Sequence, residues 1–373
     1  MVKPIVIAAG GTGGHLFPAE ALAAELLRRG ERIALMTDAR SSAYDSAAFA
    51  NAERFVLSGA GLSGRGMRRA AKGAMQLLAG TVQARRHLGQ LNPAAVVGFG
   101  GYASFPPLAA ARLMGVSRRP AIILHEQNAV LGRANRLMAR ASDLLALSFE
   151  GTTNVPSGTR TEVVGNPVRP ALAALADQPY PPIPEGGVLR LLVTGGSQGA
   201  RIFADVVPPA VAALPEAIRA RLLVTQQCRA EDLARTETAY RKAGVVANLA
   251  PFFPDIAGRL ATAHLVVARA GASTVAELAC AGRPSVLVPL PSAIDDHQNA
   301  NARALAEADA AWVYPQPAFT PAALAERMTA LFTVPERLAS AAAAASALAR
   351  PQAARDLADQ VLALARRATM GAA

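Results

Sequence analysis

Two glycine-rich loops, each directly after a short apolar run, constrain the fold of this chain more than any other feature of its sequence. Residues 10–14 read GGTGG and follow an apolar run, Pro4–Ala9, that we expect to form a strand. Residues 195–199 read GGSQG and follow a second run, Leu189–Thr194, 185 residues later in a chain of 373. A strand that turns through glycines into a helix presents free N–H groups and a positive helix end, which together bind phosphate. One such loop can be a mere tight turn, but two in matching positions predict two doubly wound α/β domains in tandem.

Short apolar runs alternate with helical patterns in both halves of the chain, which predicts parallel sheets covered on both faces. The further predicted strands are Ile33–Thr37, Ala94–Gly98, Ala121–His125, Leu144–Ser148, Arg221–Thr225, Leu265–Ala268 and Ser285–Pro289. The predicted helices include Ala19–Gly30, the alanine-rich stretch 339–349 and the tail 352–367. We therefore expect Rossmann-like domains at 1–165 and 166–345, and a helical tail at 346–373 that packs back toward the first domain.

Several protein classes are excluded by the same sequence. The two cysteines, Cys228 and Cys280, are too few and too far apart for a disulfide scaffold or a cysteine zinc site. The first loop fails the GxGxxG dinucleotide pattern at Leu16, and no GK[ST] phosphate loop occurs. Met1–Gly14 lacks the apolar core of an export signal. Residues 93–111 carry no charge but contain six glycines and prolines, so they predict a buried strand, a turn and a helix start rather than a membrane span.

The basic residues are concentrated in the first half. The net charge is +11, and residues 1–165 hold 19 lysines and arginines against 10 acids, whereas residues 166–373 hold 19 against 17. No acid occurs between Phe55 and His125, so this segment should attract anions. The bases in it are Arg65, Arg68, Arg69, Lys72, Arg85, Arg86, Arg112, Arg118 and Arg119.

The side chains among these bases favour a membrane surface over nucleic acid. No Phe, Tyr or Trp lies between Gly59 and Leu91, whereas a groove for nucleic acid usually interleaves aromatics with bases. Apolar side chains occur there instead, as in a helix that lies at a membrane interface. Those next to the basic cluster are Met75, Leu77 and Leu78. The alternative interpretation is an ordinary solvated basic surface.

Seven sequence blocks in order resemble the MurG family of membrane-associated glycosyltransferases. They are GGTGGHLFPA (10–19), GFGGYASFPP (98–107), LHEQNAVLGRAN (124–135), VVGNPVR (163–169), VTGGSQGAR (193–201), ARAGASTVAELACAGRPSVLVPLP (268–291) and DHQNANA (296–302). The resemblance implies a GT-B fold, in which two Rossmann-like domains hold the active site in the cleft between them. It also implies transfer of N-acetylglucosamine (GlcNAc), with inversion, from UDP-GlcNAc to the muramyl 4-hydroxyl of undecaprenyl-linked lipid I, which makes lipid II for peptidoglycan.

The resemblance implies donor-binding roles for residues in both halves. Arg169 would pair with the donor diphosphate, Phe253 would lie against uracil, and Glu277 would accept hydrogen bonds from the ribose hydroxyls. The other implied UDP-GlcNAc contacts are Thr12, Gly13, Gly14, Asn128, Ser197, Ala272, Ser273, Thr274, Val275, Ala276 and Gln298. One alternative stays open, because Thr274 and Glu277 also fit a helix capping box.

His15 is the candidate for the chemistry. Inverting transfer needs a base for the acceptor proton, and imidazole exchanges protons near neutral pH. His15 follows the first loop and should lie at a helix start, where it would act as the base or position the acceptor. His125 and Glu126 are competing candidates.

The remaining implications concern partners and location. No metal or cofactor is expected, because the chain has no Asp-x-Asp motif of the kind that holds a diphosphate-bridging cation. The resemblance implies a peripheral protein on the cytoplasmic face of the bacterial inner membrane, with anionic phospholipid and with cell-wall synthesis and division proteins as partners. Rival functions are a UDP-GlcNAc 2-epimerase on the same fold, a non-catalytic sugar-nucleotide sensor and a nucleic-acid-binding protein.

Overall fold

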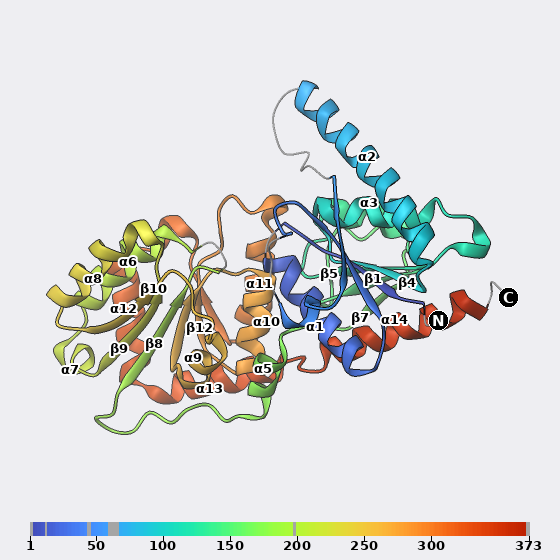
Figure 1. Cartoon of the computed structure of the whole chain (residues 1–373). Coiled ribbons are helices and arrows are strands. Elements are labelled where there is room, and N and C mark those ends of the chain that lie inside the picture. The colour runs from blue at the N-terminus through green and yellow to red at the C-terminus, as the bar shows by residue number, and fades with distance from the viewer. Residues whose placement is uncertain (1–2, 12, 43–45, 59–66, 197–198, 371–373) are drawn as a thin grey trace. The chain divides into compact units, whose positions relative to one another are not determined.

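The computed structural model describes residues 3–11, 13–42, 46–58, 67–196 and 199–370, with the backbone alone described at 67–70 and 370. The chain divides into two compact units, each built on its own parallel sheet (Figure 1). Unit 1 comprises Met1–Arg169 and Gln352–Ala373, and unit 2 comprises Pro170–Pro351. The boundaries expected at 165/166 and 345/346 lie a few residues before these divisions.

The sheet of unit 1 has the strand order β3-β2-β1-β4-β5-β6-β7, and every pairing in it is parallel. Its strands are β1 (Ile5–Ala8), β2 (Ile33–Asp38), β3 (Glu53–Leu57), β4 (Ala95–Gly98), β5 (Ala121–Glu126), β6 (Leu144–Leu147) and β7 (Thr161–Val163). The inner strands are buried along their whole length, which explains their continuous apolar sequences.

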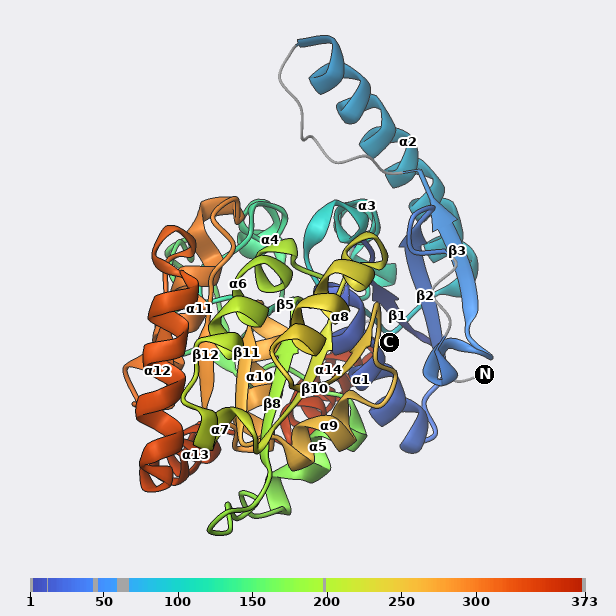
Figure 2. The ribbon, with the colours of Figure 1, turned by 90° about the vertical axis from the view of Figure 1, so that its left-hand side faces the viewer.

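Alternate residues of these strands pack against different helices. Ile5 and Ile7 of β1 face a core formed with α1 (Gly13–Arg28) and α14 (Ala353–Met370). Val6 faces the opposite core, which holds side chains of α2 (Met67–Leu91), α3 (Gly101–Arg112) and α4 (Arg133–Met138). The C-terminal helix therefore belongs to unit 1, next to α1. The N-terminal half of α2 extends away from the rest of unit 1 (Figures 1 and 2).

The sheet of unit 2 has the strand order β10-β9-β8-β11-β12-β13, again all parallel. Its strands are β8 (Leu189–Thr194), β9 (Leu222–Gln227), β10 (Val246–Ala250), β11 (Leu265–Ala268), β12 (Ser285–Leu287) and β13 (Ala311–Val313). Its helices are α5 (Pro170–Ala173), α6 (Arg201–Ala212), α7 (Glu216–Arg219), α8 (Leu233–Lys242), α9 (Ile256–Thr262), α10 (Ala272–Ala281), α11 (His297–Ala306), α12 (Pro321–Thr333) and α13 (Pro335–Ala347).

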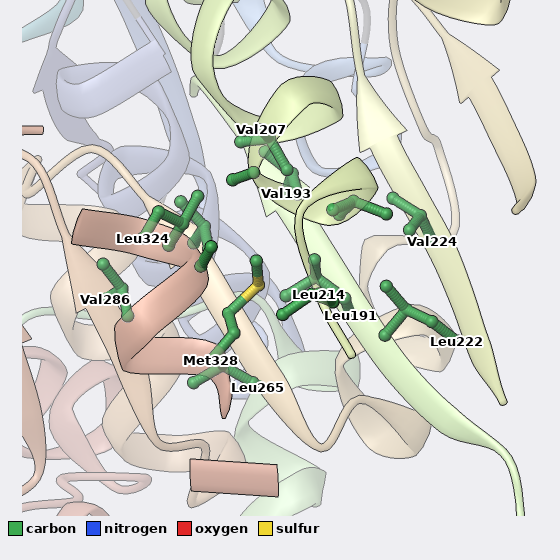
Figure 3. Packing of buried hydrophobic residues seen from close by; sticks show 14 of the residues in the cluster. Leu191, Val193, Val207, Leu214, Leu222, Val224, Leu265, Val286, Leu324 and Met328 are labelled. Atoms are coloured by element: carbon green, nitrogen blue, oxygen red, sulfur yellow. The ribbon is translucent and has the colours of Figure 1, made fainter. Parts of the chain in front are cut away.

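One face of the second sheet forms a large apolar core with α6, α8 and α12. Leu191 and Val193 of β8 meet Val207 of α6 and Leu324 and Met328 of α12 in this core (Figure 3). Burying such side chains stabilises a fold by about 1.5–3 kcal/mol each. Helix α10 lies on the other face of the sheet (Figure 1).

The C-terminal end of α10 is anchored by a buried cation. Arg283 is fully buried and donates hydrogen bonds to carbonyls at the ends of two helices. These are the carbonyls of Leu260 and Ala261 in α9, of Ala281, which ends α10, and of Gly282, which follows it. Carbonyls at a helix C-terminus have no partner within the helix, and a cation there is favourable. Arg283 thereby fixes the helix whose opposite end belongs to the candidate site.

The predicted strands are confirmed to within two residues at each end, but four others were missed. These are β3, β7, β10 and β13, the outermost strands of the two sheets. They are short and partly or largely exposed. Polar residues interrupt β3, β7 and β10, whereas β13 (Ala-Trp-Val) is apolar but only three residues long. Helix α1 also begins earlier than predicted, at Gly13, and contains Pro18. Pro18 is the sixth residue of this helix, so it removes the backbone hydrogen bond to the carbonyl of Gly14.

The uncharged segment 93–111 forms β4, a glycine turn and all of α3 except its last residue. The predicted strand and turn are confirmed, and the predicted helix start is nearly a whole helix. Among the described residues, no helix is both long enough and apolar enough to span a membrane.

Candidate active site

The first glycine loop connects β1 to α1 and is held by unit 1 itself. A Cβ atom at Gly10 would lie 2.8 Å from that of Ala103 and 3.0 Å from Oδ1 of Asp38, so a larger residue does not fit. Gly11 has a φ of +91° and donates its N–H to Oγ of Ser41, 2.7 Å away. The loop leads into the first turn of α1, where Gly13 and Gly14 lie. Thr12 lies outside the described residues.

His15 lies in the first turn of α1, and its ring packs on a second glycine turn. A Cβ atom on Gly101 would come within 3.3 Å of both Cδ2 and Nε2 of the ring, and one on Gly100 within 3.5 Å of Cε1. Both glycines have positive φ and form the start of α3. The Nδ1 atom of His15 lies 2.9 Å from Oε1 of Gln127. Nε2 has no hydrogen bond to another described residue.

The segment that supplies Gln127 follows β5 and is organised by Glu126. This carboxylate is buried, and one of its oxygens accepts from the backbone N–H and the side-chain amide of Asn128, each at 3.0 Å. The other oxygen accepts from the N–H of Gly132 and the amide of Asn135, each at 2.9 Å. With both oxygens engaged, Glu126 is suited to hold Asn128 in place rather than to abstract a proton.

His125 is also engaged inside the protein. It is fully buried, its Nε2 bonds to the carbonyl of Gly165 at 3.0 Å, and its Nδ1 bonds to Nε2 of Gln127 at 2.9 Å. Burial lowers the pKa of His125 to about 4, although the bond to Gly165 and the charge of Glu126 act in the opposite direction. His125 is therefore neutral at pH 7, and its ring does not reach solvent. Of the three candidate bases, only His15 is partly exposed.

Arg169 lies at the end of unit 1, with its guanidinium 4.7 Å from the centre of the Phe17 ring on α1. Phe17 is two residues after His15 on α1, so the guanidinium of Arg169 lies near the same end of this helix. Asn166, in the same segment, is buried, and neither polar atom of its side chain bonds to a described residue. An unbonded buried amide is costly, so Asn166 is a further candidate for contact with a ligand.

The second glycine loop is tied to its neighbours by Gln227, which ends β9. Its Oε1 accepts from the N–H of Gly195 and the hydroxyl of Thr194, each at 3.0 Å. Its Nε2 donates to the carbonyls of Gly196 and Pro251, at 2.8 and 3.2 Å. At Gly195 a Cβ atom would lie 2.3 Å from the backbone nitrogen of Ala200, so only glycine fits. Ser197 lies outside the described residues.

The start of α10 lies beside this loop, because β8 and β11 are adjacent and Thr194 pairs with Ala268. The helix begins at Ala272 and its N-cap is Gly271. A capping box would need Thr274 at the N-cap, so that alternative for Glu277 is wrong. Ala272 and Val275 are buried, whereas Ser273, Thr274, Ala276 and Glu277 are half-buried. The hydroxyl oxygen of Ser273 is buried without a hydrogen bond to any described residue.

Phe253 and Gln298 are both held by protein contacts. Phe253 is buried, with the guanidinium of Arg259 3.9 Å from the ring centre, whereas its neighbour Phe252 is 58% exposed. The Oε1 of Gln298 accepts from the N–H of Leu290 at 2.9 Å, which joins the start of α11 to the segment after β12. Contact of Phe253 with uracil and of Gln298 with the sugar stay predictions.

Two arginines near the second loop, Arg229 and Arg269, were not predicted as site residues from the sequence. A Cβ atom on Gly199 would lie 3.1 Å from Cγ of Arg229, so this side chain packs on the loop. Arg269 follows β11 and donates to the carbonyls of Val288 and Pro289, at 3.0 and 3.1 Å. Burial lowers the pKa of Arg269, and the charge of Arg229 adds to the effect. Neither belongs to a recognisable pattern, because only the sheet brings the ends of β9 and β11 to the second loop.

The predicted membrane residues lie on or just before α2. Lys72, Met75, Leu77 and Leu78 belong to this helix, and Met75 and Leu78 are 69% and 67% exposed. Lys72 and Met75 line a cavity of about 540 Å³ together with Val56 of β3. Arg65 lies outside the described residues, and for Arg68 and Arg69 only the backbone is described, within α2.

No group of three or more His, Cys, Asp and Glu side chains suited to a metal ion occurs in the described part of the chain. The donors that the two loops offer are instead backbone N–H groups at helix N-termini, which suit anions.

Sequence comparison identifies both units. Residues 5–145 match the glycosyltransferase family 28 N-terminal domain, and residues 190–361 match the glycosyltransferase family 28 C-terminal domain. A relative from Granulibacter bethesdensis is 58% identical over 96% of this chain and 93% of its own. It carries the name UDP-N-acetylglucosamine--N-acetylmuramyl-(pentapeptide) pyrophosphoryl-undecaprenol N-acetylglucosamine transferase.

Comparison with solved structures also points to the MurG family. The crystal structure of MurG from Acinetobacter baumannii is 30% identical, with a TM-score of 0.77 over 97% of this chain and 99% of that one. The UDP-GlcNAc 2-epimerase of Neisseria meningitidis has a TM-score of 0.63 over 96% of this chain and 100% of that one. At 12% identity this second likeness concerns the fold alone.

Proposed function

This chain belongs to glycosyltransferase family 28 and to the MurG family within it, and from that membership we propose what its two loops do. The protein is a glycosyltransferase that moves GlcNAc from UDP-GlcNAc onto lipid I, the muramyl-pentapeptide pyrophosphoryl-undecaprenol, and so forms lipid II. The observation that carries this conclusion is the identity with the named transferase along nearly the whole chain. The epimerase alternative has only a shared fold in its favour.

We propose that unit 2 binds the donor nucleotide. The N-termini of α6 and α10 follow adjacent strands, so their N–H groups and dipoles favour a diphosphate at the ends of β8 and β11. Arg229 lies against the same loop and adds positive charge. Glu277, one turn into α10, would accept from the ribose hydroxyls, and the unbonded hydroxyl of Ser273 favours a ligand at this helix end.

We propose that His15 takes the acceptor proton. In this step the 4-hydroxyl oxygen of the acceptor attacks C1 of GlcNAc from the face opposite the diphosphate. The C1–oxygen bond then breaks, its electron pair leaves with UDP, and the hydroxyl proton passes to the ring of His15. The geometry supports His15 because its Nε2 has no hydrogen bond to another described residue, whereas His125 and Glu126 are buried and engaged. Arg169, held beside α1, would stabilise charge on the departing diphosphate.

We propose that α2 attaches the protein to the cytoplasmic face of the membrane that carries its acceptor. Met75, Leu78 and Val82 are spaced along one side of the helix and are 67–70% exposed. The basic residues at its start would add attraction to anionic headgroups. Apolar side chains beside bases on one helix are typical of interfacial attachment.

The decisive experiment measures transfer from radiolabelled UDP-GlcNAc to a lipid I analogue. Labelled lipid product and UDP should form only when both substrates are present, and His15→Ala should lower kcat by about 10²–10⁴ with little change in UDP binding. Conversion of UDP-GlcNAc without an acceptor would indicate an epimerase. Near-normal kcat in the His15 variant would remove this residue from the chemistry, and a large loss of UDP affinity would make it a donor ligand.

A further inference from the structure

The side chain of Gln127 bridges two histidines, and its orientation is determined by its contacts. Its Nε2 lies 2.9 Å from Nδ1 of His125 and 3.0 Å from the carbonyl oxygen of the same residue. A carbonyl oxygen can only accept, so the atom facing it must be the amide nitrogen. The opposite end of the amide, which faces His15, is therefore the oxygen. Gln127 is 1% exposed, so water does not compete for these bonds.

The protons of His125 follow from the same reasoning. Its Nε2 lies 3.0 Å from the carbonyl of Gly165, which can only accept, so this nitrogen carries a proton. The other nitrogen, Nδ1, accepts from the amide of Gln127 and is bare. The neutral ring that this requires agrees with the pKa of His125, which burial lowers to about 4.

The hydrogen bond between Gln127 and His15 can then have only one donor. Oε1 of Gln127 accepts from Nδ1 of His15, so Nδ1 carries the proton. A neutral imidazole has one protonated nitrogen, which leaves Nε2 of His15 bare. Which ring nitrogen is protonated is set by the bond that the other one makes. Here that bond is the end of a sequence of contacts from Gly165 through His125 and Gln127 to His15.

We propose that Gln127 and His125 are positioning residues that hold His15 in the Nδ1–H tautomer, so that Nε2 is the proton acceptor in the transfer reaction. The inference rests on the proposed role of His15 as the base. We call the hydrogen bonds from Gly165 through His125 and Gln127 to His15 the relay. Without the relay, the imidazole of His15 can change tautomer or its ring can flip. A fraction of the enzyme would then present a protonated Nε2, which cannot act as a base. In many enzymes a carboxylate accepts the Nδ1–H bond of the catalytic histidine and so fixes its tautomer. Gln127 takes that position here without adding a charge.

The first test reads the tautomer directly in the full-length protein without substrates. ¹⁵N-labelled histidine is observed by NMR above pH 7, where protonated and bare ring nitrogens have distinct shifts, and the His15 signals are assigned with His15→Ala. The expected result is a protonated Nδ1 and a bare Nε2 at His15, with the opposite pattern at His125. Gln127→Met should shift His15 toward a mixture of tautomers. A protonated Nε2 at His15 in the unaltered protein would overturn the proposal.

The second test separates positioning from folding. Gln127→Met, which keeps the volume but loses the amide, should lower kcat about tenfold, as expected for one lost hydrogen bond, while KM for UDP-GlcNAc stays unchanged. Gln127→Glu retains an oxygen toward His15 and should recover part of this loss. The matched control is Gln226→Met, which removes an equally buried amide in unit 2 and should leave kcat unchanged. Thermal unfolding of each variant checks that it is folded.

The outcomes distinguish this proposal from the one it rests on. An unchanged kcat in folded Gln127→Met would contradict the relay, even if His15→Ala is inactive. An active His15→Ala would contradict the base assignment instead, and the NMR tautomer would still decide whether Gln127 and His125 orient the ring.

Discussion

Asn128 donates two hydrogen bonds to a single carboxylate oxygen of Glu126, one from its backbone N–H and one from its side-chain amide, and both are 3.0 Å long. The pair joins the end of β5 to the segment that carries Gln127. Since the other oxygen of Glu126 accepts from Gly132 and Asn135, one buried carboxylate organises the segment that holds both Asn128, a predicted contact of UDP-GlcNAc, and Gln127, which bonds to His15.

Replacing Glu126 by glutamine should damage stability and donor use together. An amide at this position turns a donor toward two other donors, and a lost hydrogen bond to a charged group costs about 1.5–3 kcal/mol. We expect the free energy of unfolding of Glu126→Gln to fall by about 2–4 kcal/mol in urea, and kcat/KM for UDP-GlcNAc to fall at least tenfold. The exposed Glu237→Gln on α8 is the control and should change neither. Full stability of Glu126→Gln would show that the carboxylate is not the organiser.

Glu277 is expected to bind the ribose of the donor. Glu277→Ala should lower kcat/KM for UDP-GlcNAc by at least tenfold, because a hydrogen-bonded carboxylate contributes about 1.5–3 kcal/mol. Steady-state kinetics with varied donor at saturating acceptor analogue measures this. Glu326→Ala, on the exposed side of α12, is the control. Donor kinetics that barely change in a folded Glu277 variant would leave Glu277 with a structural role only.

Transfer should not depend on a divalent metal ion. The chain has no Asp-x-Asp motif, and in the proposed donor site the N-termini of α6 and α10 face the diphosphate instead. Turnover should therefore be unchanged when the enzyme is dialysed against EDTA and assayed in its presence. Activity that is lost in EDTA and restored only by Mg²⁺ or Mn²⁺ would contradict this prediction.

Attachment to vesicles should have a salt-sensitive and a salt-resistant part. Glutamine at Arg65, Arg68, Arg69 and Lys72 should weaken sedimentation with phosphatidylglycerol vesicles at low salt, since each base near an anionic surface contributes about 1 kcal/mol. Glutamine at Met75, Leu78 and Val82 should remove the binding that persists at high salt. Both variants should lose lipid I turnover and keep UDP affinity.

The control for the vesicle experiment is Val246→Gln in unit 2, which removes an apolar side chain of equal exposure, 70%. It should bind vesicles normally. If the variant with four glutamines in place of the bases also binds like the unaltered protein at low salt, those bases are an ordinary solvated surface.

Stability should fall as the pH is lowered from about 6.5 toward 4. Burial lowers the pKa of His264 from 6.5 to about 4, and the charges of Arg190 and Arg283 add to this. Because the unfolded chain takes up this proton first, the contribution is complete above pH 6.5 and is lost as the pH falls to the folded-state value. The loss is about 3 kcal/mol. Urea unfolding at several pH values should show a flatter profile for His264→Asn than for the control His297→Asn, and equal profiles would contradict the prediction.

The sequence alone determined the centre of each sheet. Strands such as β1, β4 and β11 are buried on both faces, so their sequences must be continuously apolar, and that pattern is visible without any knowledge of neighbours. The glycine loops are also recognisable from the sequence. Glycine is required where φ is positive or where other atoms leave no room for a Cβ atom, as at Gly10 and Gly195. The family blocks added the candidate ligands, including His15 and Glu277.

Only the tertiary structure decided the edges of the sheets and the contacts that link the loops. The outermost strands β3, β7, β10 and β13 are short and partly or largely exposed, so they form because a neighbouring strand offers hydrogen bonds and not because of a long, fully buried apolar run. Gln127 and Gln227 are polar residues at strand ends, and nothing local distinguishes them from surface glutamines. Their roles arise because each amide meets partners far away in the chain, as in the bond from Gln127 to His15, 112 residues earlier. A hydrogen bond depends on the distance between atoms in space, which the order of residues along the chain does not specify.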